Sequence, residues 1–122
     1  MSRQSKGGAA PEVSSGDLLR GTLESMILRV VADRPHHGYG IGRALERALG
    51  EGAVVEDGSL YPALYRLERR GLLHGTWKRS EANRRARFYA PTPKGRRTLA
   101  ARIREWTSFS EAVTRLLAGA RR

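Results

Sequence analysis

Arginine and tyrosine side chains gather on one face of a predicted helix that spans residues 59–71. On a helical wheel of about 100° per residue, its aliphatic side chains share one face and the remaining large side chains project opposite. Guanidinium groups bind guanine edges and phosphates through paired hydrogen bonds, and the free amides of a helix N-terminus also favour phosphate. This chemistry is typical of a recognition helix in the major groove of duplex DNA. The predicted contact residues are Ser59, which we expect to cap the helix, with Tyr61, Pro62, Tyr65, Arg66 and Arg69.

A second basic segment follows this helix directly. Two short strands are predicted over residues 72–78 and 85–90, and a polar turn joins them. A basic hairpin after a recognition helix is a wing, which lies along phosphates or over the minor groove and adds affinity more than sequence information. The cations that we assign to this wing are Lys78, Arg79, Arg84, Arg85 and Arg87.

The net charge of +11 is concentrated in one internal stretch of the chain. Between Arg66 and Arg104 there are 13 lysines and arginines against two acids, Glu68 and Glu81, so this stretch carries all of the net charge. A phosphate backbone is the commonest partner of such a segment. The alternative is a solvated basic surface kept for solubility, which does not require the charge to be confined to one stretch.

The elements that must hold these two segments follow from hydrophobic periodicity. Amphipathic helices are predicted over residues 19–31 and 39–49, and Thr92 followed by Pro93 is a typical start for a long last helix that ends near Leu117. We therefore expect a mainly α fold with a small β-hairpin, namely a winged helix-turn-helix plus a long C-terminal dimerisation helix. The expected divisions are a disordered tail over 1–17, the winged-helix domain over 18–92 and the dimerisation helix over 93–122.

The last helix carries an apolar seam. Large apolar residues recur at steps of three and four, and a single copy would leave much of this stripe exposed, so we expect a homodimer. Trp106 is either a large residue of the dimer core or, with Phe109, the border of a pocket for a small aromatic ligand. The predicted interface residues are Leu99, Ile103, Trp106, Val113 and Leu116.

Three segments of the chain carry a resemblance to a known family. They are HGYGI over 37–41, LYPALYRLE over 60–68 with GLL over 71–73, and RFYAPTPKG over 87–95. In this order and at this distance they resemble PadR-type transcriptional regulators, over about residues 19–117. The resemblance implies a winged-helix domain, a dimer formed through the C-terminal helix, and repression by operator binding. It also implies that small aromatic compounds or drugs release some members from DNA. We expect the short branch, without a larger C-terminal domain.

Other classes of protein are disfavoured. The absence of cysteine excludes disulfides, thiolate zinc sites and a cysteine nucleophile, and it suits a reducing cytoplasm. His36 and His37 have no third ligand at zinc-site spacing, so we predict no metal site. No nucleophile elbow or phosphate loop is present. We therefore predict no catalytic residues and no cofactor, and we expect that the protein is not an enzyme. No apolar run approaches the ~20 residues that span a bilayer.

Two functions remain for this basic chain. The leading one is a sequence-specific DNA-binding repressor that binds a palindromic operator as a dimer. The alternative is a basic winged-helix module that binds structured RNA or a ribosome. Composition does not separate them, but the seam favours DNA because a dimer would place two recognition helices in successive major grooves.

Overall fold

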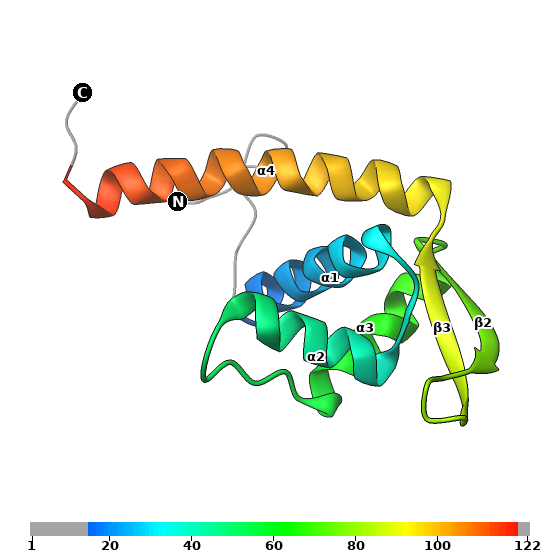
Figure 1. Ribbon diagram of the computed structural model, residues 1–122. Coiled ribbons are helices and arrows are strands. Elements are labelled where there is room, and N and C mark those ends of the chain that lie inside the picture. Colours follow the sequence, from blue (N-terminus) through cyan, green and yellow to red (C-terminus); the bar gives the residue numbers. More distant parts are fainter. Residues whose placement is uncertain (1–14, 120–122) are drawn as a thin grey trace.

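The computed structural model describes residues 15–119, with side chains from residue 21 onward, and contains four helices and three short strands (Figure 1). The predicted fold class, mainly α with a small hairpin, is confirmed. In chain order the elements are α1 (Ser15–Asp33), β1 (His36–His37), α2 (Gly38–Leu49), α3 (Asp57–Arg69), β2 (Leu73–Arg79), β3 (Arg85–Pro91) and α4 (Pro93–Leu117).

The predicted N-terminal tail differs from the observed start of α1. Residues 1–14 lie outside the described part of the chain, whereas residues 15–17 already belong to α1. The first helix therefore begins four residues earlier than the hydrophobic periodicity indicated.

The core lies where α1, α2, α3 and the start of β2 meet. Ile27 and Leu28 of α1 are completely buried, so this helix packs on more than one side. Burying an aliphatic side chain of this size contributes about 1.5–3 kcal/mol each, and this core is the main source of stability in so small a domain. Its other fully buried large side chains are Val31, Ile41, Leu60, Leu64 and Leu67.

The sheet has three antiparallel strands in the order β1-β3-β2. The two-residue strand β1, which the sequence did not predict, pairs His37 with Phe88. The His37 ring meets the Phe88 ring edge-on at 5.1 Å, and its Nδ1 accepts a hydrogen bond from the Gly40 amide at the start of α2. A Cβ on Gly38 would lie 2.6 Å from the Tyr61 ring, so this position lets α2 approach α3 closely. The HGYG motif thus joins the sheet, α2 and α3.

The start of α3 differs from the prediction. The helix begins at Asp57 after Glu56, so Ser59 is its third residue and not its cap, and that part of the prediction is wrong. The amides of Ser59 and Leu60 both bond to the carbonyl of Glu56, which extends the helix by two residues. Pro62 consequently lies inside the helix, where it cannot donate a backbone hydrogen bond.

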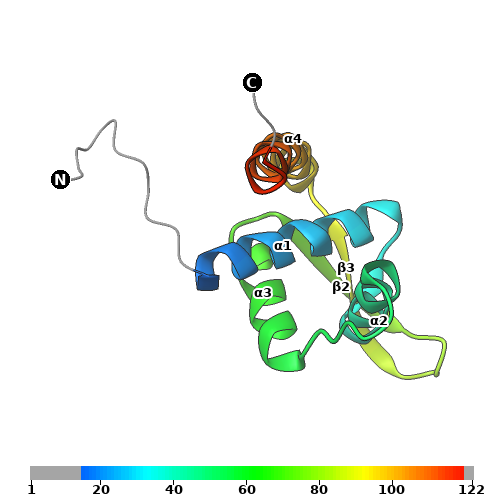
Figure 2. The ribbon, with the colours of Figure 1, turned by 90° about the vertical axis from the view of Figure 1, so that its left-hand side faces the viewer.

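Helix α4 is anchored at its first turn and then leaves the domain. The Thr92 hydroxyl accepts from the Gly95 amide at 2.9 Å and donates to the Gly71 carbonyl at 2.6 Å. A Cβ on Gly95 would lie 2.1 Å from the Leu72 carbonyl oxygen, so the helix backbone rests directly on the residue before β2. From there α4 passes over α1, and its C-terminal half extends beyond the rest of the molecule (Figures 1 and 2). No helix among the described residues is long and apolar enough to cross a membrane.

Candidate nucleic-acid interface

One face of α3 is open to solvent and carries most of the residues predicted from the sequence. Tyr65 is 63% exposed, and the guanidinium of Arg69 lies over its ring, 5.7 Å from the centroid. The stack holds both side chains outward from the helix while the leucine face packs into the core. Ser59, Tyr61 and Pro62 are exposed on the N-terminal half of the same helix.

Arg66 does not share this open face, and its predicted direction away from the core is wrong. Its Nε donates to Oε2 of Glu24 at 2.8 Å, and only 33% of the side chain is exposed. Glu24 belongs to α1 and is itself 3% exposed. The arginine therefore leans across the edge of α3 toward α1, because a buried carboxylate requires a charged partner.

The tip of the wing presents exposed cations. Arg84 and Arg85 are exposed at the turn, and Arg79 donates to the Asn83 carbonyl at 3.1 Å, which holds the turn closed. Asn83 has a φ of 60°, a left-handed conformation that asparagine tolerates better than most residues. Cations stack on aromatic rings along the strands: Lys78 lies 4.8 Å from the Phe88 centroid and Arg85 lies 5.0 Å from that of Trp77.

Arg87 connects the wing to α3 and does not project from it. It donates a hydrogen bond to the Glu68 carboxylate, and this bond raises the pKa of Arg87 above its ordinary value. Its guanidinium also lies 5.8 Å from the Trp77 centroid, so Trp77 and Glu68 together hold it. Neighbouring Tyr89 is partly buried against the core, and burial raises the pKa of its hydroxyl.

A cleft of about 680 Å³ separates the wing from the start of α2 and from α3. Its lining includes both aromatic and cationic side chains, which suit stacking and phosphate contacts. Its aromatic residues are Tyr39, Tyr61, Trp77 and Tyr89, and its cations come from Arg84, Arg85 and Arg87.

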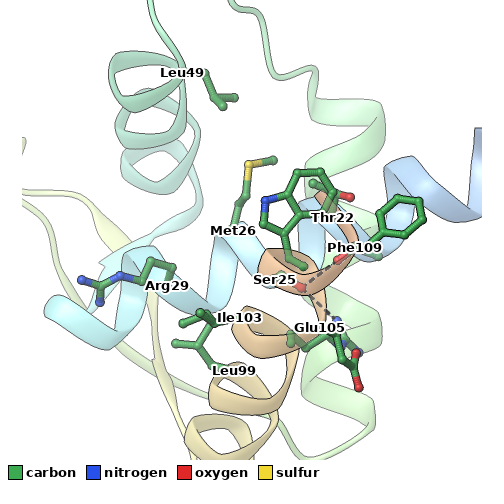
Figure 3. Close-up of a pocket in the computed structure, with 12 residues that line it drawn as sticks. Thr22, Ser25, Met26, Arg29, Leu49, Leu99, Ile103, Glu105 and Phe109 are labelled. Carbon is green, nitrogen blue, oxygen red and sulfur yellow. Dashed lines mark hydrogen bonds between the residues drawn. The ribbon is translucent and has the colours of Figure 1, made fainter. Parts of the chain in front are cut away.

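A second cavity, of about 600 Å³, lies between α1 and α4 on another part of the molecule. Figure 3 shows Thr22 and Met26 of α1 beside Ile103 and Phe109 of α4. The Trp106 and Phe109 rings are 6.5 Å apart, and both residues line the cavity. The structure thus brings together the two residues predicted to border a ligand pocket. We call this cavity the α1–α4 groove.

The predicted dimer seam is mostly exposed in the single chain. Ile103, Trp106 and Leu116 are exposed, and Val113 is half-buried. Leu99 is different: it is 8% exposed and belongs to the core of its own chain, so its prediction as an interface residue is wrong. The periodic pattern runs through Leu99 without a break because the same helix face first packs on α1 and then extends past it.

The family model of the transcriptional regulator PadR-like family matches residues 27–101, which is more than half of the chain. The chain belongs to this family. The resemblance stated from the HGYG, LYPAL and RFYAPTPKG segments is therefore confirmed, and PadR-like regulators have DNA as their partner.

Solved PadR-like structures have the same fold, and a regulator known by its sequence is also similar. The chain is similar to a PadR-like transcriptional regulator of Bacillus cereus, with 31% identity and a TM-score of 0.72, over 82% of this chain and 95% of that one. A PadR family regulator of Eggerthella lenta has 31% identity and a TM-score of 0.69, over 83% and 86% of the two chains. A transcriptional regulator of Mycobacterium tuberculosis is 39% identical over 80 residues, which are 66% of this chain and 71% of its own length.

Within this PadR-like chain, sequence reasoning missed the two acids that organise the interface. Glu24 and Glu68 were counted only as charges, although they hold Arg66 and Arg87. A polar residue on the buried stripe of the first helix is the signal that marks Glu24, since such a residue needs a partner. No pattern in the sequence indicated that Trp77 would lie against Arg85 and Arg87. No group of three or more potential metal ligands occurs among the residues whose side chains the structure describes, 21–119.

Proposed function

We propose that this PadR-like regulator is a repressor that binds a palindromic operator as a homodimer, with α3 in the major groove and the wing on the phosphates. The observation that carries the proposal is the open face of α3, where Tyr65 and Arg69 stack beside a basic wing. The DNA contacts assigned to α3 are Ser59, Tyr61, Pro62, Tyr65 and Arg69. Those assigned to the wing are Lys78, Arg79, Arg84 and Arg85.

Arg66 and Arg87 have a supporting part in this proposal. Each is held by a carboxylate from another element, so a contact with phosphate would first require that ion pair to break. Arg66 fixes α3 against α1, and Arg87 fixes the wing against α3. They set the angle between the two DNA-binding elements.

The dimer in this proposal forms through α4. Its exposed apolar side chains continue beyond the domain, and contiguous apolar patches of this kind are rarely left uncovered. A second α4 of the same sequence offers a matching stripe. The residues that it would cover are Ile103, Trp106, Val113 and Leu116.

The α1–α4 groove is the proposed site of a small aromatic effector. It is mainly apolar, it has a size suited to such a ligand, and it offers the faces of Trp106 and Phe109. The effector would release the operator only if it binds the free protein more tightly than the DNA-bound protein.

A gel-shift comparison tests the choice of nucleic acid. The purified chain is titrated against the duplex upstream of its own gene, an equal-length random duplex and an RNA hairpin of equal length. The proposal expects the upstream duplex to bind roughly 10³-fold or more tightly than the random duplex, with the RNA no better than the random duplex. Tightest binding to the RNA would overturn it in favour of the RNA-binding alternative.

A further inference from the structure

One carboxylate in the middle of α1 joins three arginines, which belong to α3, to its C-cap and to α4. Oε2 of Glu24 accepts from Arg66 of α3 at 2.8 Å, and Oε1 accepts at 3.0 Å from Arg70, the C-cap residue directly after α3. Arg102 of α4 approaches the same Oε1 at 3.8 Å. We call these four residues the Glu24 cluster. It links the helix assigned to DNA recognition with the helix assigned to dimerisation.

The position of Glu24 makes this link difficult to break. The side chain is almost completely buried, and a buried carboxylate is strongly disfavoured without charged partners. Because Oε1 is shared, the places taken by Arg70 and Arg102 depend on one another. A shift of α4 that moves Arg102 therefore changes the contacts available to α3.

Arg102 also stands at the edge of the α1–α4 groove. Its guanidinium donates to the Ser25 hydroxyl at 3.4 Å, and Ser25 in turn donates to the Gly21 carbonyl at 3.0 Å. Both Ser25 and Arg102 line the groove, whereas Glu24 is not among its lining residues. Arg102 therefore lines the groove and is at the same time a member of the Glu24 cluster.

We propose that Glu24 and Arg102 are positioning residues for DNA recognition, which fix the angle of α3 against α4 and so the separation of the two recognition helices in the dimer. The inference rests on the proposed function, because that separation has a meaning only for a dimer on two half-sites. It adds a named contact through which events at α4 reach α3. Arg66 and Arg70 hold α3 within one chain, and Arg102 relates it to the dimer axis.

The variant that tests this is Arg102→Met, which keeps most of the apolar stem and removes the charge. The DNA probe is the tightest-binding duplex that the wild-type chain selects from a random-sequence pool. Three forms are compared: the selected duplex, the same duplex with one base pair inserted between half-sites, and a single half-site. The matched control is Arg104→Met, which removes one exposed arginine from the same helix, with no acidic partner among the described residues.

The inference expects Arg102→Met to bind the single half-site as the wild type does. Its affinity for the selected duplex should fall about threefold to tenfold, the usual range for a coupling residue, and the penalty for the inserted base pair should shrink. Arg104→Met should change neither the affinity for the selected duplex relative to the half-site nor the penalty for the inserted base pair. Glu24→Gln should change these same two quantities more than Arg102→Met does, because it weakens the contacts with Arg66 and Arg70 as well.

Two other results would overturn the inference. If Arg102→Met matches the wild type on all three duplexes, Arg102 does not set the spacing. If it loses equal affinity for the half-site and the full duplex, it acts as a general DNA contact or through stability. A wild-type chain that selects only single sites would overturn the proposed function itself, and with it this inference.

Discussion

At the scale of single residues, two carboxylates decide which arginines are free for DNA. Glu24 holds Arg66 and Glu68 holds Arg87, while Arg69 and Arg85 lie against aromatic rings. Arg69 also donates to the Tyr65 hydroxyl at 3.4 Å. A cation stacked on an exposed ring keeps its charge and most of its hydrogen-bond donors available, whereas a carboxylate neutralises the arginine that it binds and occupies some of its donors. The four arginines are therefore expected to behave differently when they are replaced.

On α3, Arg69→Ala should weaken operator binding without affecting folding. A loss on the order of 1–3 kcal/mol in binding is expected if Arg69 contacts a base edge, with the melting temperature unchanged. Arg66→Ala should instead mainly lower stability. We expect a loss of about 1–3 kcal/mol in the free energy of unfolding, since the variant removes a partner from buried Glu24. Fluorescence anisotropy and urea denaturation measure the two quantities. Equal stability losses in both variants would contradict the assignment.

On the wing, Arg85→Ala should lower the dependence of affinity on salt. Each phosphate contact removed reduces the slope of log affinity against log salt by roughly one, for specific and random duplexes alike. Arg87→Ala removes the same charge from the same strand, but its effect on the slope should be smaller because Glu68 already neutralises it. Titrations between low and moderate salt compare the two variants. A larger slope change for Arg87→Ala would reverse the roles given to them.

At the scale of elements, the first turn of α4 determines how the long helix leaves the domain. Thr92 caps the helix and also bonds to Gly71, and the backbone at Gly95 rests on Leu72. These contacts fasten α4 to the segment between α3 and β2. The direction of α4 is thus coupled to the two elements that carry the DNA contacts.

Gly95→Ala should be destabilising because its methyl group has no room. A cost of about 1–3 kcal/mol in unfolding free energy is typical of forced overpacking, and operator affinity should fall as α4 tilts. The matched control is Gly21→Ala in α1, where an added Cβ meets nothing within 4 Å and alanine is the better helix former. Thermal and urea unfolding of both variants provide the comparison. A Gly95→Ala protein as stable as the wild type would show that this contact is not tight.

The elements themselves were predicted well from the sequence, and the side-chain partners were not. Hydrophobic periods, Thr92 with Pro93, and the turn residues are local signals, so α2, β2, β3 and α4 fall within a residue or two of their predicted bounds. The Glu24 contact with Arg66 joins residues 42 positions apart, and a helical wheel gives a direction but no partner. Leu99 was misassigned for a related reason: the periodic pattern of α4 does not show which part of its apolar face packs on α1 of the same chain. The two extra helical residues before Ser59, Asp57 and Gly58, have no hydrophobic periodicity.

At the scale of the whole molecule, the account requires a dimer. Ile103→Asp would place a charge in the exposed seam of α4, where a partner helix would bury it at a high desolvation cost. We expect a monomer that retains its helical circular dichroism and loses most of its operator affinity. Light scattering and sedimentation at micromolar concentration measure the assembly. A wild-type chain that is already monomeric there would contradict the dimer.

Binding of an effector should be visible through Trp106. In a Trp77→Phe variant the remaining tryptophan reports on the α1–α4 groove alone. Saturable quenching by a planar aromatic compound, with a parallel fall in operator affinity, is the expected result. Quenching that leaves DNA binding unchanged would mean a pocket without regulatory effect, and no quenching across a broad panel would leave Trp106 as a residue of the dimer core.

The central claim is that two α3 helices of one dimer read two half-sites of duplex DNA. Hydroxyl-radical footprinting of the region upstream of the gene tests it most directly. The account predicts two protected blocks on one face of the duplex, centred one helical turn of about 10–10.5 base pairs apart or a multiple of it, over inverted repeats. It also predicts that Arg69→Ala weakens both blocks together. A single unsymmetrical block, or uniform protection that is unchanged in Arg69→Ala, would contradict it.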